Sequence, residues 1–358
     1  MRAGFMSRML DIGRWSTWVM LLAVLVLVSV VFSLIAPGFA TVGSLDNILV
    51  VAVPVALLAM GESLAIYSGG IDLSVGAMLG LGGMSGGAIM SGLYHGQTGT
   101  DIGLMLLGLG VALAVGLVGG LFNGFVIGKL KLEPLIVTLG TLGIFGGAAD
   151  LISGGEPLSS FPPSSFELGN GSLVGFLPIL VAIGIVVLCL FLFVERMTTL
   201  GRHIFALGAN RDALVRAGVT PNGVILWVYA LAGVAAAFAG FLKASQFQTA
   251  TPIAGQNTLL LGVAAVVIGG APLTGGEGTV LGAGLGAILI SVLENGFVEL
   301  GLQSYWQVVA VGALVIVAVY VSQVQQRRKT FGYRHRVRAG TVPAGLMLDE
   351  GGSEEHAT

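Results

Sequence analysis

Charged residues are scarce in this chain, and cysteine is almost absent. Asp, Glu, Lys and Arg make up 9% of its 358 residues, whereas soluble domains contain about 25%. The single cysteine, Cys189, lies within the apolar run LVAIGIVVLCLFLF, so the chain has no disulfide framework. These shortages exclude an ordinary soluble domain and a small disulfide-stapled one.

The chain also lacks the patterns that catalysis, metal binding or nucleotide hydrolysis would need. Its four histidines are scattered over expected loops and tail, and no His-Glu-x-x-His occurs. Gly128-Lys129 is followed by Leu130 and lacks a glycine five residues before Gly128, so it is not a phosphate-binding P-loop. No basic, aromatic-laced surface indicates nucleic acid. We therefore expect no catalytic residues, metal or cofactor, and any uphill transport would draw on an ion gradient or another polypeptide.

Hydrophobic residues, at 55%, and 58 glycines without a collagen-like period dominate instead. Long unbroken apolar runs predict an all-α polytopic membrane bundle, because a membrane barrel would show short alternating segments. We expect about ten transmembrane helices, with Gly-rich breaks: 15–35, 46–67, 71–93, 102–128, 134–152, 173–194, 222–242, 257–271, 277–298 and 305–322. Residues 1–14 and 323–358 then flank a membrane domain at 15–322, and the tail is expected to be disordered beyond 339.

The distribution of positive charge predicts the orientation of these spans. With both termini inside, the cytoplasmic segments hold every one of the 16 Lys and Arg residues except Lys243. Cytoplasmic loops carry such an excess in membrane proteins. The first apolar run is longer than a signal-peptide core, so we interpret it as a retained helix. Both termini are therefore predicted to be cytoplasmic.

Two expected spans carry small residues at four-residue spacing, which places them on one helix face. The fourth has Gly108, Ala112, Gly116, Gly120, Gly124 and Gly128, and the ninth has Gly278, Gly282 and Gly286. Such faces let a neighbouring helix approach closely. We interpret both as packing surfaces rather than functional sites.

Intramembrane carboxylates are few. The candidates for an ion relay are Glu62, Asp72, Asp150, Glu277 and Glu294. Only Glu62 and Glu294 fall well inside expected spans, and no Lys or Arg of the sequence pairs with them there. Ion-coupled carriers use intramembrane carboxylates for a proton relay. So few carboxylates argue against such a relay without excluding one.

Asp72 lies in YSGGIDLSVG, where one span ends and the next begins. Gly69 and Gly70 permit a break in the helix, after which Asp72 can accept a hydrogen bond from the amide of Ser74 or Val75 and cap the following helix. We favour this re-entrant turn over a role as substrate ligand. The related stretch GGAPLT, with Gly269 and Gly270, also ends a span. These two Gly-Gly turns are candidate gating elements.

The largest polar cytoplasmic loop, 195–221, contains a predicted short helix, 211–217. Asn210 is a good N-cap, Asp212 lies in the first turn, and Gly218 followed by Pro221 predicts the end. Such an amphipathic helix could dock into a soluble partner or lie against the protein's own inner face. The residues that would couple to a partner are Arg202, Asn210, Arg211, Asp212, Leu214, Arg216 and Gly218.

Several stretches in order resemble one known family. They are GGIDLSVG (69–76), EPLIVTLGTLGIF (133–145), GRHIFALGAN (201–210) with the following RDALVRAGV, and AAVVIGGAPLTGGEGTVLGAGLGA (264–287), together with Asn123-Gly124, Asn295-Gly296 and SYWQ (304–307). These look like the permease subunits of ribose-type sugar ABC importers, and the resemblance covers about residues 40–322. One departure is Leu259–Leu261, where ribose-type permeases often carry Glu-Leu-Asp. Another is Glu294, where Asn is more usual.

The resemblance implies a permease without its own ATPase site, in the bacterial inner membrane, that moves a pentose or hexose into the cytoplasm. It implies three partners: a cytoplasmic ATP-binding subunit docked on the coupling helix at 211–217, a periplasmic or lipid-anchored sugar-binding protein, and a second permease copy or paralogue. Alternatives are a related permease for branched-chain amino acids or nucleosides, and an ion-coupled secondary carrier. Asn123, Thr138 and Asn295 are candidate pathway residues, because an importer that releases sugar needs only a few weak polar contacts.

Overall fold

A computed structural model describes residues 3–94, 96, 101–303, 305–310, 312, 313, 316, 317 and 320, with side chains described from Val19 onward. The tail that the sequence predicts to be disordered, and a part of the expected span at 305–322, lie outside these residues. The elements in chain order are α1 (Ala3–Ile35), α2 (Val42–Tyr67), α3 (Val75–Leu93), α4 (Ile102–Lys129), α5 (Pro134–Ser153), α6 (Pro163–Asn170), β1 (Ser172–Leu173), β2 (Leu177–Pro178), α7 (Ile179–Met197), α8 (Thr199–Ala209), α9 (Arg211–Arg216), α10 (Pro221–Phe247), α11 (Gln256–Ile268) and α12 (Val280–Glu299).

The prediction of an all-α membrane bundle is confirmed. Among the described residues, six helices, namely α2, α4, α5, α7, α10 and α12, are long and apolar enough to cross a membrane. The described apolar part of α1, Val19–Ile35, and α11 are shorter. The expected count of ten crossings therefore stays a prediction.

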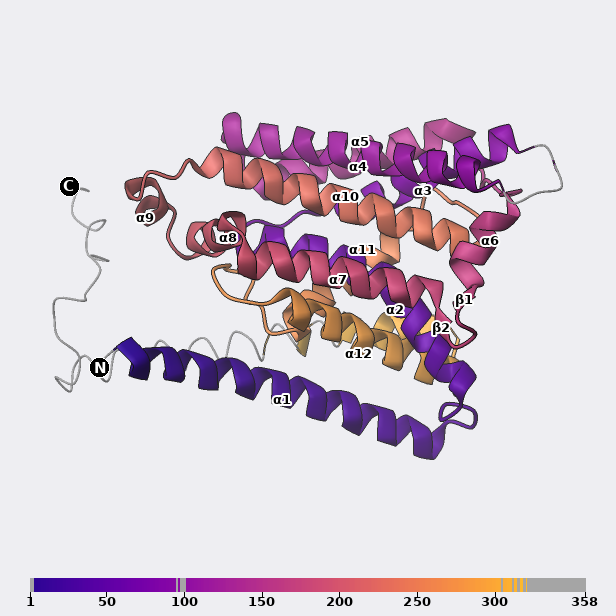
Figure 1. Cartoon of the computed structure of the whole chain (residues 1–358), viewed down its shortest axis with the longest axis horizontal. Helices are drawn as coiled ribbons and strands as arrows, with labels where there is room; N and C mark the ends of the chain where they lie inside the picture. The colour runs from indigo at the N-terminus through magenta and orange to yellow at the C-terminus, as the bar shows by residue number, and fades with distance from the viewer. Residues whose placement is uncertain are drawn as a thin grey trace.

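Helices α2 and α10 form the centre of the bundle. In the most apolar stretch of each helix, the share buried inside the protein is 78% for α2 and 72% for α10. It is only 17% for α7 and 28% for α5. The close approach of the two central helices requires small residues, since a Cβ atom at Gly61 would lie 2.9 Å from the Cβ of Ala235. Around this pair, α3 and α4 pack on α10, while α11 and α12 pack on α2 (Figure 1).

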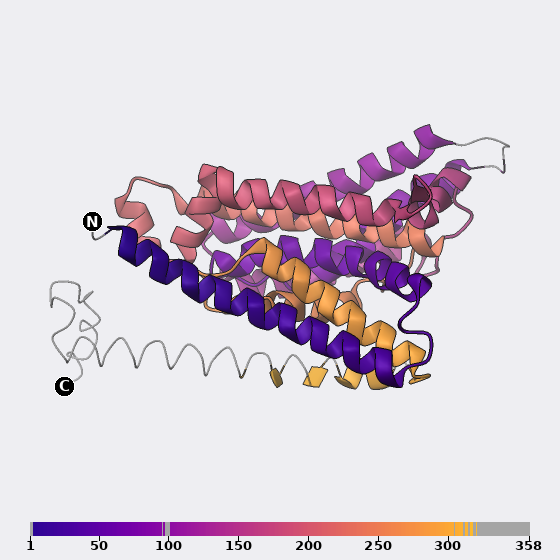
Figure 2. The same cartoon turned by 60° about the horizontal axis from the view of Figure 1, so that its bottom comes forward.

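The first helix lies at the edge of the bundle and packs along α12 (Figure 2). Aromatic rings make this contact: the ring centroids of Phe32 and Phe39 are 5.4 Å apart, and Phe32 meets Phe297 edge-on at 5.7 Å. Ile48 and Val292 complete this small separate cluster. The contact holds α1 to the protein through a few side chains, and most of its described surface stays exposed.

The glycine face of α4 packs as the sequence predicts. A Cβ atom at Gly124 would lie 2.7 Å from the Cα of Leu226 on α10, and one at Gly108 would lie 2.9 Å from the backbone oxygen of Gly86 on α3. In the ninth expected span, Gly286 likewise packs against Ala265 of α11. Gly278 differs, because it precedes α12 and has a φ of +142°.

Several expected boundaries shift in the structure. The sixth span begins at Ile179 rather than 173, because residues 172–178 form the β1–β2 hairpin. The outer loop contains α6, and a bridge pairs Leu158 with Ala250. Helix α10 continues to Phe247, so Lys243, expected outside the spans, lies within a helix and is mostly buried.

The two ends of the bundle carry different elements (Figure 1). Helices α8 and α9 lie at one end, near the beginning of α1. Helix α6 and the β1–β2 hairpin lie at the opposite end, with the end of α10. The orientation predicted from the distribution of Lys and Arg would make the first end cytoplasmic and the second external.

Candidate functional site

The two Gly-Gly stretches form the same backbone motif. After α2, the amide of Gly69 donates to the carbonyl of Ile66 (2.9 Å) and that of Gly70 to Ala65 (2.9 Å). After α11, Gly270 and Ala271 donate in the same way to Val267 (3.0 Å) and Val266 (3.2 Å). This pattern is the Schellman motif, which needs a left-handed residue just past the helix end. Gly69 and Gly270 supply it, with φ values of +87° and +94°.

The end of α2 meets the loop that follows α11, although about 200 residues separate the two in the sequence. The amide of Gly276 donates to the carbonyl of Tyr67, the last residue of α2, at 3.0 Å. A Cβ atom at Gly275 would lie 2.8 Å from the Cα of Gly69. The loop that follows α11 is thus attached to the end of α2 by direct backbone contact.

Helix α8 closes this junction from the end of the bundle that carries α9 (Figure 1). A Cβ atom at Gly208 would lie 2.6 Å from the nitrogen of Gly276 and would also overlap the carbonyl of Tyr67. Gly208 therefore packs against the hydrogen bond that joins the end of α2 to the loop after α11. The rings of Tyr67 and Phe205 stack beside it, with centroids 5.2 Å apart and planes 19° from parallel. We call Tyr67, Gly69, Phe205, Gly208 and Gly276 the cytoplasmic junction, after the orientation that the sequence predicts.

Asp72 lies in the turn that leaves this junction, and it is 1% exposed. Its Oδ1 accepts from the amide of Ser74 at 2.9 Å and from the Ser74 hydroxyl at 2.5 Å. Helix α3 begins at Val75 with Ser74 as its N-cap, and the Ser74 side chain caps no amide. Asp72 thus accepts from the expected amide, but it sits two residues before the cap position. The helix also begins four residues later than expected.

Two of the three candidate pathway residues contact the same turn. Asn123 of α4 donates from Nδ2 to the Ser74 hydroxyl at 2.8 Å, and the Thr138 hydroxyl of α5 lies 3.3 Å from the carbonyl of Ile71. Both side chains are buried. Two helices, α4 and α5, therefore contact the Asp72 turn through polar side chains.

Asn295 lies elsewhere, near the C-terminal end of α12. Its Oδ1 accepts from Nδ2 of Asn47 at 2.8 Å, and its Nδ2 donates to the Ser44 hydroxyl at 2.7 Å. It is 5% exposed and joins α12 to the start of α2. The sequence could not separate this internal link from a pathway contact, because both require an amide within an apolar helix.

The side chains of Glu62 on α2 and Tyr229 on α10 lie against the Asp72 turn. The amide of Asp72 donates to Oε1 of Glu62 at 3.1 Å, while Oε2 of Glu62 and the Tyr229 hydroxyl have no hydrogen-bond partner among the described residues. A Cβ atom at Gly70 would lie 2.6 Å from that hydroxyl. In the described part of the chain, no group of three or more His, Cys, Asp or Glu residues could hold a metal ion.

The sequence predicted Glu62 only as an isolated acid and did not single out Tyr229. Glu62 lies ten residues before Asp72, but Tyr229 is far away on α10. A single tyrosine in a hydrophobic helix forms no sequence pattern that would predict the contact between Tyr229 and the Asp72 turn. The structure also brings Lys243 close enough to Glu294 for their charges to interact. Glu294 therefore has a basic neighbour that the expected spans did not give it.

The short helix α9 forms where the sequence predicts it. Oδ1 of Asn210 accepts from the amide of Ala213 at 2.8 Å, and Gly218 after the helix has a φ of +80°. Leu214, named as a coupling residue, is only 4% exposed and holds α9 against the protein. Arg211, Asp212 and Arg216 are exposed, and Val215 is 51% exposed. The outward face of α9 therefore carries charged side chains around Val215. Leu214 packs inward and anchors the helix to the protein.

Comparison with known proteins gives the family context. A family model described as "Branched-chain amino acid transport system / permease component" matches residues 44–319. A probable ABC transporter permease protein of Sinorhizobium fredii is 34% identical over 288 residues, which cover 80% of this chain and 83% of that protein.

Two similar proteins come from Escherichia coli K12. Its ribose import permease protein is 33% identical over 310 residues, which cover 86% of this chain and 93% of that protein. Its galactofuranose transporter permease protein is 37% identical over 322 residues, which cover 87% and 91%. No solved structure matches this chain significantly.

Proposed function

This chain belongs to the family of permease components of branched-chain amino acid transport systems, and we propose that within it the chain moves a monosaccharide into the cytoplasm. The observation that carries the proposal is the similarity, over more than 80% of the chain, to permeases named for ribose and for galactofuranose, a pentose and a hexose. These names favour a sugar over the amino acid or nucleoside alternative. The name of the Sinorhizobium fredii relative, a probable ABC transporter permease protein, favours an ABC importer over an ion-coupled carrier.

Permease components of ABC importers work with ATP-binding and substrate-binding subunits, and the chain is a membrane permease subunit of this kind. We place the ATP-binding partner on α9, because the exposed Arg211, Asp212 and Arg216 can form ion pairs and hydrogen bonds with a soluble protein. Val215, half exposed among them, supplies an apolar contact. Such a helix inserted in a groove is a recurrent mode of recognition. ATP hydrolysis would then occur entirely in the partner.

The cytoplasmic junction is the route by which movement of α9 would reach the membrane helices. Helix α9 follows α8 after a single residue, Asn210. Gly208 and Phe205 of α8 contact the end of α2 and the loop after α11. Displacement of α8 would therefore move the Gly69-Gly70 turn and the loop after the Gly269-Gly270 turn, together with the Asp72 turn next to them. We propose that these turns form the inner gate.

The remaining partners would bind other surfaces. Helix α6 and the β1–β2 hairpin lie at the end opposite α9 (Figure 1). A periplasmic or lipid-anchored sugar-binding protein would bind at that end and release its sugar to the permease. The exposed faces of α4 and α5 in the described structure include Leu139, Ile144 and Val118, which suit lipid or a second permease copy or paralogue. Both termini would lie in the cytoplasm, and residues 195–221 would form the coupling loop.

Reconstitution tests the transport reaction. The chain is purified together with its ATP-binding subunit and placed in proteoliposomes with the loaded binding protein. We expect ATP-dependent accumulation of a sugar, measured with radiolabelled D-ribose and D-galactose and with L-leucine as the comparison. Accumulation of L-leucine instead of either sugar would contradict the sugar assignment. Accumulation by the chain alone would contradict the dependence on a partner.

A pair of variants tests the docking surface. Val215→Glu adds a negative charge to the outward face of α9 and should reduce co-purification of the ATP-binding subunit. Leu132→Glu is the matched control, because Leu132 lies in the short α4–α5 loop and is 49% exposed, against 51% for Val215. Equal loss of the ATP-binding subunit in both variants, or in neither, would remove α9 as the docking helix.

A further inference from the structure

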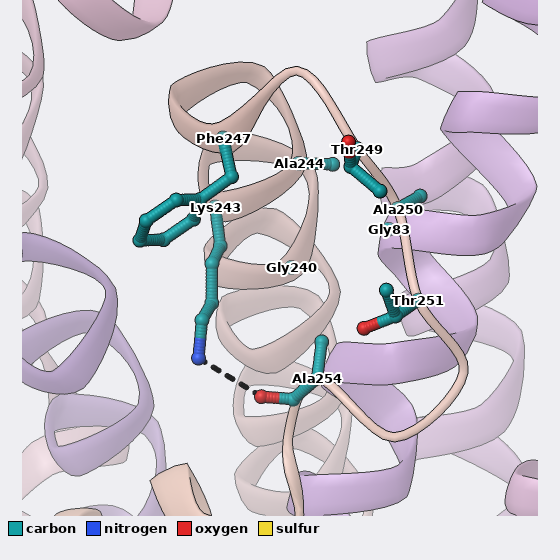
Figure 3. Close-up of a pocket in the computed structure, with 9 residues that line it drawn as sticks. All are labelled: Gly83, Gly240, Lys243, Ala244, Phe247, Thr249, Ala250, Thr251 and Ala254. Atoms are coloured by element: carbon teal, nitrogen blue, oxygen red, sulfur yellow. Dashed lines mark hydrogen bonds between the residues drawn. The ribbon is translucent and has the colours of Figure 1, made fainter. Parts of the chain in front are cut away.

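A pocket of about 250 Å³ lies at the outer end of α10 and has no role in the mechanism proposed above. Figure 3 shows it between α10, α3 and the loop that connects α10 to α11. Its polar lining comes from Lys243, Thr249, Thr251 and the carbonyl of Ala254, and Phe247 lies beside them. At about 30 Å³ per water molecule, this volume equals roughly eight waters. It suits a small polar ligand rather than a peptide.

The pocket exists because α3 and α10 meet through glycines at its base. A Cβ atom at Gly83 would lie 2.9 Å from the carbonyl oxygen of Gly240, and both glycines line the pocket. Any larger residue would separate the helices or project into the space. The loop wall is fixed in turn, since Ala250 and Leu158 exchange backbone hydrogen bonds of 2.8 and 2.9 Å. The close packing of α3 against α10 and the fixed loop therefore determine the shape of the pocket.

The polar groups of the pocket have unused hydrogen-bonding capacity. Lys243 donates to the carbonyl of Ala254 at 2.9 Å and to the Thr258 hydroxyl at 3.0 Å. An ammonium group has three donors, and the third has no acceptor among the described residues. The Thr249 and Thr251 hydroxyls likewise form no hydrogen bond within the described structure. In Figure 3 the Thr251 hydroxyl points from the loop toward α10.

The charge of the pocket favours a neutral ligand. Lys243 interacts electrostatically with Glu294 of α12, so its positive charge is already partly balanced. An anion would compete with this carboxylate, whereas a neutral hydroxyl accepts from the ammonium without disturbing it. Phe247, with its side chain 60% exposed, adds an apolar ring at the same site. Several hydrogen-bonding groups beside one aromatic ring suit a molecule that has hydroxyls on one side and C–H groups on the other.

We propose that this pocket is the receiving site for the monosaccharide on the outer side of the permease, where Lys243 and Thr251 bind sugar hydroxyls and Phe247 contacts the C–H face. The inference rests on the proposed transport of a monosaccharide and adds the site of first contact. The sugar would take the third donor of Lys243, while the Ala254 and Thr258 contacts keep the ammonium in place. Because the site uses few groups, its affinity is low enough to pass the sugar onward.

Cysteine protection tests this assignment, and the single native cysteine makes the design simple. In the complete complex, Cys189→Ser removes the exposed native thiol, and Thr251→Cys places a thiol in the pocket. Labelling by a membrane-impermeant maleimide is followed with D-ribose or D-galactose, whichever the wild-type complex imports. At a sugar concentration of about three times Kd, labelling should slow about fourfold. Ile253→Cys is the control, since Ile253 is 63% exposed on the same loop and does not line the pocket.

Lys243→Met provides the second arm. Loss of the charged donor should raise the sugar concentration needed to protect Thr251→Cys by about tenfold, with Ile253→Cys unaffected. Equal protection at positions 251 and 253, or none at 251 for a sugar that the complex imports, overturns the site while leaving the transport function intact. Faster labelling of Ile253→Cys in the Lys243→Met background, with sugar protection unchanged, also overturns it, because Lys243 would then only fasten the loop. Import of neither sugar by the wild-type complex refutes the transport function itself, and the receiving site with it.

Discussion

The role of Asp72 can be decided by comparing two substitutions. Its Oδ1 accepts both the amide and the hydroxyl of Ser74, and the site is almost completely buried. Asp72→Asn retains an oxygen that can accept both hydrogen bonds. Asp72→Leu has a similar size but removes that oxygen, so two buried donors lose their acceptor. The two variants therefore separate the hydrogen-bonding role of the side chain from its charge.

The magnitude follows from the cost of unsatisfied polar groups. Each buried donor left without a partner costs about 1–3 kcal/mol. Leucine avoids the desolvation that the carboxylate suffers, which offsets part of the loss. We therefore expect Asp72→Leu to lower the free energy of unfolding by about 2–3 kcal/mol, while Asp72→Asn stays within about 1 kcal/mol of wild type.

Because a membrane protein in detergent unfolds irreversibly, the assay measures the rate of unfolding rather than an equilibrium. The half-life of monodisperse protein in detergent at a fixed temperature is compared by size-exclusion chromatography. Asp72→Leu should shorten it by about tenfold or more, and the Asn variant should resemble wild type in half-life and in sugar uptake. If Asp72→Leu keeps the wild-type half-life and loses only transport, Asp72 acts on the substrate or the gate, and its hydrogen bonds to Ser74 are not what stabilises the turn.

Three further predictions concern packing and coupling. Gly116→Ala should lower the free energy of unfolding by about 1–3 kcal/mol, because its Cβ would lie 2.5 Å from the carbonyl oxygen of Gly233; Gly110→Ala, on the open face of α4, should be neutral or up to about 1 kcal/mol stabilising in the same half-life assay. Asn295→Ala should shorten the half-life but leave the KM for sugar unchanged in proteoliposomes; a raised KM would return it to the pathway. Gly208→Val should lower sugar uptake per ATP hydrolysed several-fold in the reconstituted complex, and unchanged stoichiometry would contradict the proposed route.

Local turn chemistry was predictable from the sequence, because it depends on a few neighbouring residues. The Gly69-Gly70 break, the Asn210 cap and the end of α9 at Gly218 all follow from rules that act within one helical turn. The glycine face of α4 was predictable as a packing surface for the same reason. Its partner, α10, was not, since nothing in the spacing of the glycines identifies the neighbouring helix.

Long-range contacts account for what the sequence did not reveal. Gly208 sits in an ordinary helical stretch, and only the fold brings it against Tyr67 and Gly276. The amphipathic pattern of α9 gave Leu214 as an apolar residue, but it could not say whether that residue faces a partner or the chain itself. Lys243 was expected outside because the apolar run ends just before it, although α10 continues for another turn.

Backbone contact at the cytoplasmic junction bears on how force could be transmitted. Flexible side chains between α8 and α2 would absorb a small displacement by changing rotamer. At Gly208 no side chain intervenes, so the backbone of α8 meets the hydrogen bond between Gly276 and Tyr67 directly. Close-packed elements resist compression and transmit strain. A shift of α8 must therefore move the end of α2 or break that hydrogen bond. In the proposed coupling route, the glycines of the junction, more than the charged residues of α9, would therefore convert docking into movement of the membrane helices.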